Sequence, residues 1–165
     1  MACLAKIRWL VIELREISSD NYQDALTLSV RADQTNLVAP LTKSLADAYV
    51  YPESTFRLAY DGEQVIGYLL VFPYESEGVS CVNIVRLMID QRFQGQGFGR
   101  ALLDSAIELI EELHPHTSRL RISTLPENTP ALELYRSAGF VESGLEEDEI
   151  ALYRELSEAP KKGVE

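Results

Sequence analysis

The residue types and spacing best suited to chemistry are three glycines at alternate positions, Gly95, Gly97 and Gly99. They stand between a strand-like apolar run, residues 82–89, and a helix-like run, residues 98–113. Glycine lets the backbone adopt a positive φ and lets a ligand approach without a Cβ in the way. Where such a turn opens a helix, the unpaired backbone N–H groups and the helix dipole together favour a pyrophosphate. The stretch predicts a phosphate-binding loop, with a plain strand-to-helix turn as the alternative.

The spacing of these glycines excludes two familiar nucleotide loops. It is G-x-G-x-G, whereas dinucleotide folds use G-x-G-x-x-G and an acidic residue that closes the βαβ unit. No Gly-Lys-Ser/Thr follows, so the loop is not a Walker A loop. The frame Gln94-x-x-Gly97-x-Gly99 instead resembles the acyl-CoA pyrophosphate loop of the GNAT N-acetyltransferase superfamily.

A second motif follows further along the chain, Asn128-x-x-Ala131-x-x-x-Tyr135-x-x-x-Gly139-Phe140. It resembles the second cofactor-side element of the same superfamily, which is a short helix with a tyrosine, a glycine that stops the helix, and then a strand.

The whole chain resembles this superfamily over roughly residues 12–156, and residues 84–89 are similar to its central strand. The similarity is greatest to bacterial diamine and spermidine/spermine acetyltransferase-like members. The resemblance implies an α/β (α+β) fold, with a mixed, mostly antiparallel sheet of about six to seven strands flanked by about four helices. It also implies an enzyme that moves an acetyl group from acetyl-CoA to a primary amine, a polyamine or a diamine.

The resemblance assigns acyl-CoA to the loop, the central strand and the second motif. Backbone donors of the loop would hold the pyrophosphate, and a bulge in the central strand would free main chain for the pantetheine arm and the acetyl group. A main-chain N–H near Leu87 would bond the carbonyl oxygen, and a Cβ at Gly97 would stand where the pyrophosphate approaches. Plain buried strand and, for Asn128, a helix cap are the alternatives. The predicted cofactor-binding residues are Leu87, Met88, Ile89, Gln94, Gly95, Gln96, Gly97, Phe98, Gly99, Arg100 and Asn128.

Tyr135 is the predicted catalytic residue, because its hydroxyl would protonate the departing thiolate as a general acid; a core tyrosine is the alternative. A primary amine titrates near ~10.4 and arrives protonated, so a base is also needed. Some polyamine-acetylating relatives carry a glutamate on the central strand where this chain has Val85. The simplest substitute is a water chain to a distant carboxylate, with Asp33, Glu75 and Glu149 as candidates.

The acceptor pocket of this fold would be walled by residues 31–40 and by the last hairpin, residues 144–149. The hairpin carries four consecutive acidic residues, 146–149, which suit a polyamine but also suit a solvated turn. The net charge of −11 favours a cationic substrate and argues against nucleic acid. Many acidic proteins carry such a charge for solubility alone.

Length and composition predict one domain, residues 1–165, with 46% hydrophobic and 25% charged residues, as in ordinary globular proteins. Residues 1–10 are a leader or a lengthened first strand, and residues 159–165 are a loose tail. Cys3 and Cys81 are too few for a disulfide framework, which favours a cytoplasmic location. We expect a small-molecule amine as partner, no metal, no nucleic acid and no membrane, with a homodimer as a candidate assembly.

The expected element order is β-α-α-β-β-β-α-β-α-β-β. The first half is expected to hold a strand at 12–17, a helix from the caps at 18–20 to residue 30, and a helix at 42–51. Strands at 55–60 and 64–72 follow around an Asp-Gly turn, and a turn at 73–78 leads to a strand at 80–89. The second half is expected to hold a helix at 98–113, a strand at 119–124, a helix from 129 to Gly139, and strands at 140–143 and 149–156.

Three other functions compete with polyamine acetylation. A GNAT enzyme could acetylate another amine, such as an aminoglycoside, an amino acid or a protein N-terminus. A non-catalytic acyl-CoA-binding module is kept open by Val85, although the intact loop and Tyr135 argue against it. An NAD enzyme of the Rossmann type ranks last, because the glycine spacing and the element order disfavour it.

Overall fold

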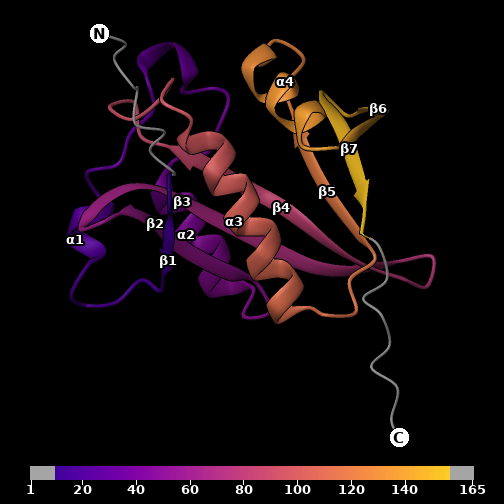
Figure 1. The fold of residues 1–165 in the computed structure, drawn as a ribbon, viewed down its shortest axis with the longest axis horizontal. Helices are drawn as coiled ribbons and strands as arrows, with labels where there is room; N and C mark the ends of the chain where they lie inside the picture. Colours follow the sequence, from indigo (N-terminus) through magenta and orange to yellow (C-terminus); the bar gives the residue numbers. More distant parts are fainter. Residues whose placement is uncertain (1–9, 157–165) are drawn as a thin grey trace, which may run out of the picture.

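The computed structural model of the chain describes residues 10–156 (Figure 1). The segments predicted as a leader and a loose tail lie outside this range, apart from Leu10, which precedes the first strand. The elements in chain order are β1 (Glu13–Arg15), α1 (Tyr22–Ala25), a 3₁₀ turn (Ala32–Gln34), α2 (Leu41–Val50), β2 (Thr55–Asp61), β3 (Gln64–Ser76), β4 (Val79–Ile89), α3 (Phe98–Leu113), β5 (Arg119–Thr124), α4 (Thr129–Ser137), β6 (Val141–Glu146) and β7 (Glu149–Glu155).

The strands form one sheet in the order β1-β2-β3-β4-β5-β7-β6. Only β4 and β5 pair in parallel, and the other neighbours are antiparallel. A parallel pair needs a crossover connection, and α3 supplies it. The predicted mixed, mostly antiparallel sheet with flanking helices is therefore confirmed.

The central strands β4 and β5 part halfway along their length. Their ladder runs only from Cys81 to Ile84 on β4, although β4 continues to Ile89. On its other edge β4 pairs with β3, and the register there skips Val85, which is a bulge. A bulged strand bends and twists more strongly, so the bulge lies where it can turn β4 away from β5. In Figure 1, β5 lies beside β4 at one end and diverges from it towards the other, where α4 lies apart from α3.

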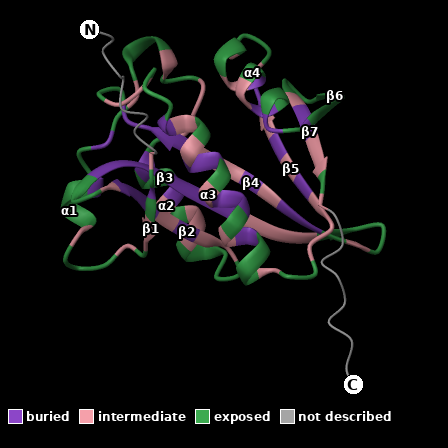
Figure 2. Cartoon of the chain, viewed as in Figure 1, coloured by how far each residue is buried: buried purple, intermediate pink, exposed green. Residues whose placement is uncertain are grey.

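Two apolar clusters cover the two faces of the sheet, and buried residues follow the strands (Figure 2). One cluster joins the sheet to α3 and α4, and the other joins it to α1 and α2. Helix α3 contributes Leu102, Leu103, Ala106 and Ile110, which recur at the three- and four-residue spacing of one helix face and are all fully buried.

The helix predicted to reach residue 30 is much shorter, because tertiary contacts override local pattern. It ends at Ala25, and the backbone N–H of Ser29 donates to the buried carboxylate of Asp90 at 2.9 Å. The backbone N–H of Gln91 in turn donates to the Ser29 carbonyl at 2.8 Å. The predicted turn at 73–78 is also too long, since β3 continues to Ser76.

Candidate active site

The glycine loop joins β4 to α3 and positions the start of that helix. Gly97 stands before α3 with φ of 90°, a left-handed conformation that favours glycine, and the helix begins at Phe98. The N–H groups in the first turn of a helix have no partner within it. The predicted strand–loop–helix arrangement is therefore present, with unpaired donors at its helical end.

A cavity of about 410 Å³ lies where β4 and β5 part, and it receives most of the predicted cofactor-binding residues. Its walls come from both central strands, the glycine loop, α4 and the segment around the 3₁₀ turn. The predicted residues that line it are Leu87, Met88, Ile89, Gln94, Gly95, Gly99, Asn128 and Tyr135. Leu87 to Ile89 pair with β3 on one edge and, within residues 10–156, have no strand partner on the other, so their main chain can bond a ligand. That these residues bind acyl-CoA stays a prediction.

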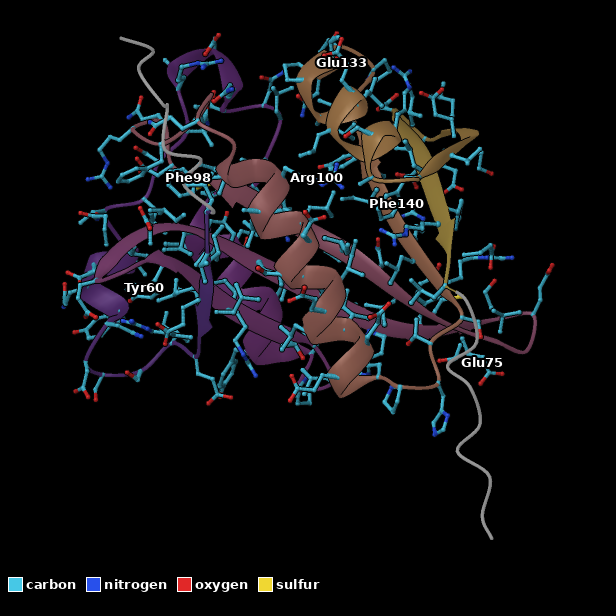
Figure 3. All side chains as sticks on the ribbon, in the orientation of Figure 1. Tyr60, Glu75, Phe98, Arg100, Glu133 and Phe140 are labelled. Carbon is cyan, nitrogen blue, oxygen red and sulfur yellow. The ribbon has the colours of Figure 1, made fainter. Side chains whose placement is uncertain are left out.

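Four predicted residues do not line this cavity. Gln96 donates to the Arg92 carbonyl at 3.1 Å, and Phe98 is buried in the core. Arg100 lies in the first turn of α3 (Figure 3), and its guanidinium pairs with Asp104 at 2.9 Å. The fourth is Gly97.

A Cβ at Gly97 would not point into this cavity, and that Gly97 contacts the pyrophosphate stays a prediction. A Cβ there would meet Leu10 Cδ1 at 3.1 Å, and Gly97 lies outside the cavity. A Cβ at Gly99 would face Leu134 Cδ2 at 3.5 Å, and both residues line the cavity. The absence of a side chain at Gly99 therefore keeps this part of the cavity open. Its φ is not in the left-handed region, so a residue with a Cβ could adopt the same backbone there.

Two side chains fix the loop against the rest of the fold. The Gln94 amide donates to the Ile89 carbonyl and to Gln34 Oε1, both at 3.0 Å, which ties the loop to the end of β4 and to the 3₁₀ turn. Asp90 is fully buried and accepts hydrogen bonds from the Arg92 side chain and from two backbone N–H groups. Burial opposes the charge of Asp90, but these hydrogen bonds hold its pKa below the ordinary value.

Tyr135 is a buried residue of α4 that also lines the cavity. Its position is therefore compatible both with a packing role in the core and with the predicted catalytic role. Burial, and then the negative charge of Glu149, raise the pKa of Tyr135 to about 12. The phenol is therefore protonated at neutral pH. Among residues 10–156 its hydroxyl has no hydrogen-bond partner, so the proton is available to a ligand.

Asn128 occupies the N-cap position of α4, yet its side chain does not cap the helix. Its amide nitrogen donates to Thr124 Oγ1 at 2.9 Å, across the end of β5. This bond fixes the amide in the wall of the cavity, where contact with a pantetheine arm remains the prediction.

A second cavity, of about 790 Å³, adjoins the first. The two segments predicted to wall the acceptor pocket contribute residues 35–40 and 146–149 to it. The two cavities share the residues Leu37, Val38, Val85, Arg86 and Ser123. An amine in the second cavity would thus meet a thioester in the first at this junction.

Four carboxylates and two guanidinium groups line the second cavity. Arg121 pairs with Glu146 at 2.6 Å and holds the pKa of that carboxyl below its ordinary value. Arg86 lies 3.8 Å from Asp47 of α2. Within the described chain, the carboxylates of residues 147–149 form no ion pair, so the cavity keeps an excess of negative charge.

Of the three carboxylates considered as the general base, only Glu149 lines one of the two cavities. Asp33 pairs with Arg31 at 3.4 Å, and Glu75 lies near the β3–β4 turn (Figure 3); neither lines a described cavity. Glu149 lines the second cavity and accepts a hydrogen bond of 2.5 Å from Ser123 Oγ. The sequence-based prediction missed Ser123, whose only signal is its place near the end of the predicted strand at 119–124.

Two absences hold for the described residues alone. In residues 10–156 no group of three or more His, Cys, Asp or Glu side chains could hold a metal ion. No helix of this range is long and apolar enough to cross a membrane.

Residues 12–140 match the Acetyltransferase (GNAT) family, and the chain belongs to that family. It is 28% identical over 141 residues to the spermine/spermidine N(1)-acetyltransferase of Bacillus subtilis (strain 168), covering 81% of this chain and 90% of that protein. The fold is similar to an acetyltransferase from Thermus thermophilus at a TM-score of 0.68, 18% identity and coverage of 89% and 98%. It is also similar to an aminoglycoside N(6')-acetyltransferase from Legionella pneumophila at a TM-score of 0.66, 18% identity and coverage of 90% and 94%.

The chain is thus an acetyl-CoA-dependent N-acetyltransferase of the GNAT family. Enzymes of this family bind acetyl-CoA and an amine acceptor, and the two adjoining cavities offer one place for each. The cofactor supplies the thioester carbonyl carbon. The residues lining the first cavity suit such a group, with unpaired main chain on β4, a neutral phenol and helix N–H groups beside Gly99.

Proposed function

We propose that the acceptor is a polyamine or a diamine and that it occupies the second cavity. The observation that carries this proposal is the excess of carboxylates there, with residues 147–149 outside any ion pair of the described chain. An extended polycation needs several negative charges along its path, and a neutral amine needs none. The spermine/spermidine acetyltransferase named above is a relative whose acceptor has this chemistry.

In the transfer, the lone pair of a neutral amine attacks the thioester carbon, and a C–N bond replaces the C–S bond. Main-chain N–H groups between Leu87 and Ile89 would stabilise the negative charge that develops on the carbonyl oxygen. The Tyr135 hydroxyl would protonate the leaving sulfur, and the tyrosinate would recover a proton from the new amide nitrogen. The products are then a neutral amide and a free thiol, with Tyr135 restored.

The test is an acceptor panel with acetyl-CoA, read out by the release of free thiol. It contains spermidine, spermine, a short diamine, a monoamine, an aminoglycoside, an amino acid and a peptide with a free N-terminus. Attraction between exposed charges is screened beyond about 8–10 Å at physiological salt. We therefore expect kcat/KM for spermidine to fall as salt rises, and to fall less for the monoamine.

A paired variant tests where the attraction originates. Glu147→Gln with Asp148→Asn should raise KM for spermidine and leave acetyl-CoA binding unchanged. The matched control is Glu111→Gln with Glu112→Gln, which removes the same charge from exposed positions on α3. If the two double variants change KM for spermidine equally, the acidic residues 146–149 form only a solvated hairpin turn and do not attract the acceptor. Turnover of a neutral or anionic amine, with no turnover of any polyamine or diamine, would contradict the acceptor class.

One observation favours an alternative acceptor of the same enzyme. Arg86 and Arg121 also line the second cavity, and the buried Arg86 Nε has no hydrogen-bond partner in the described chain. A guanidinium with a free donor suits a carboxylate, as in an amino acid or a peptide. The same panel decides between the two classes, since these acceptors carry a carboxylate and polyamines do not.

A further inference from the structure

Ser123 and Glu149 lie side by side on neighbouring strands at the junction of the two cavities. Ser123 of β5 is paired with Ala151 of β7, and Glu149 stands two positions before Ala151 on the same face. The Ser123 hydroxyl donates to Glu149 Oε2 at 2.5 Å. Ser123 lines both cavities, whereas Glu149 lines the second alone. One hydrogen bond therefore links the junction to a carboxylate that faces the more polar cavity.

Among the described residues shared by the two cavities, Ser123 is the one that can pass a proton from an amine to a carboxylate. Among the described residues, the first cavity is lined by no Asp, Glu or His. Of the five residues shared by the two cavities, three are apolar, and the fourth, Arg86, is a guanidinium that stays charged. Ser123 is the fifth, and a hydroxyl can accept a proton on its oxygen while it donates its own.

We propose that Ser123 and Glu149 form a proton relay that deprotonates the amine acceptor. The relay rests on the proposed amine acetylation, but it applies to any protonated primary amine in the second cavity. The ammonium gives one proton to Ser123 Oγ as the Ser123 hydroxyl proton passes to Glu149. The result is a neutral amine, an unchanged serine and a protonated Glu149. After transfer, Glu149 releases its proton to solvent through the second cavity.

The relay also couples the base to the acid. The negative charge of Glu149 is one cause of the raised pKa of Tyr135. Once Glu149 holds the proton from the amine, that charge is gone, and the Tyr135 hydroxyl becomes a stronger acid. This happens just before the thiolate leaves, when a proton donor is required. Deprotonating the amine would thus prepare the protonation of the sulfur.

Other charged groups surround Glu149, so a substitution among them would also change the electrostatic field at its carboxylate. Arg121 and Glu146 are paired with each other, which reduces their field at Glu149. The charged and titratable groups that face it from α4, from the neighbouring strands and from the turn are Arg86, Arg121, Tyr135, Glu146, Glu147, Asp148 and Tyr153.

The test is the pH dependence of kcat/KM, with spermidine as the probe, for the wild type, Glu149→Gln and Ser123→Ala. Without the relay, the amine must arrive neutral, and at pH 7 only about 4 in 10⁴ molecules of a primary amine are neutral. We expect both variants to lose about 10²–10⁴-fold in kcat/KM at pH 7. The loss should shrink at least tenfold by pH 9.5, because the neutral fraction rises by about two orders of magnitude.

Two further variants separate proton transfer from structure. Ser123→Thr keeps the hydroxyl and should recover most of the activity that Ser123→Ala loses. Glu155→Gln removes one carboxylate from the same strand, at its opposite end, where Glu155 pairs with Arg119 at 2.6 Å. This control should keep the pH profile of the wild type. Thermal unfolding of each variant checks that the fold is intact.

The outcomes distinguish the relay from the function on which it rests. If the wild type acetylates spermidine and the loss in Glu149→Gln is absent or equal at every pH, the relay is overturned and the polyamine proposal stands. If spermidine is inert and another amine of the panel turns over, the same profiles are measured with that amine. If no amine turns over, the proposed function and the relay fall together.

Discussion

A single methyl group at Gly99 should separate cofactor binding from folding. Gly99 lies in the first turn of α3 with an ordinary helical φ, so alanine fits there without backbone strain. Its Cβ would stand 3.5 Å from Leu134 Cδ2, which is ordinary van der Waals contact. Because Gly99 and Leu134 both line the first cavity, the methyl fills space that a pyrophosphate beside the helix N-terminus would need.

The two effects of Gly99→Ala have opposite signs. Alanine is favoured over glycine in a helix by up to about 1 kcal/mol, which raises Tm by roughly 2–4 °C in a protein of this size. Loss of the phosphate position should weaken CoA binding at least tenfold, which is about 1.4 kcal/mol. A more stable protein that binds CoA less tightly is the expected result.

Gly97→Ala is the matched comparison, and it should behave in the reverse way. Its φ of 90° is costly for a residue with a Cβ, by about 1–2 kcal/mol, and the new atom meets Leu10 and not the cavity. We expect a lower Tm with a Kd for CoA close to that of the wild type in the folded protein. Isothermal titration calorimetry and thermal unfolding measure both quantities. An unchanged Kd in folded Gly99→Ala would refute the placement of the pyrophosphate at this turn.

Three other predictions follow from the buried ionisable groups. Tyr135→Phe should lower kcat by about 10²-fold or more and leave KM for acetyl-CoA nearly unchanged, since the hydroxyl acts on the leaving sulfur; wild-type kcat would return Tyr135 to a packing role. The same variant should also be less sensitive to alkali. The neutral phenol of Tyr135 contributes its full stabilisation below pH ~10, and that contribution is lost as the pH rises through the raised pKa of about 12. Between pH 9 and pH 11.5, the free energy of unfolding measured in urea should therefore fall by about 2 kcal/mol more for the wild type than for Tyr135→Phe. Asp90→Ala should lower the free energy of unfolding by about 3 kcal/mol, because it removes the buried carboxylate that accepts from the backbone N–H groups of Ser29 and Arg92 and from the Arg92 side chain. A loss under about 1 kcal/mol in urea unfolding would contradict that role.

The parts of the fold that the sequence predicted well are those with local causes. Helix α3 and strand β5 have the predicted bounds, because amphipathic periodicity, the glycine loop and Pro115 are local signals. The predicted length of the first helix is wrong, because the backbone at Ser29 is hydrogen-bonded to Asp90, which lies 61 positions away in the chain. A local pattern cannot report a competing partner at that distance in the chain.

The same division applies to the candidate site. The cofactor side depends on backbone conformation within one strand–loop–helix unit, and its glycines mark it in the sequence. The junction depends on side chains of β4, β5 and β7 that meet only after the sheet has formed. Ser123 could not be recognised beforehand, because a serine at the end of a strand gains its meaning from Glu149 on a neighbouring strand.

Val85 on β4 and Ser123 on β5 line opposite walls of the junction, and the two walls would have different parts in deprotonating the amine. Val85 occupies the β4 bulge and lines both cavities, so an amine that reaches the thioester passes an apolar side chain on that wall. An apolar surrounding disfavours the charged form of an amine and lowers its pKa. A carboxylate at this position would instead hold the ammonium charged until it accepted the proton directly. With valine there, the β4 wall makes the amine easier to deprotonate, and the proton acceptor must come from the opposite wall, where Ser123 leads to Glu149.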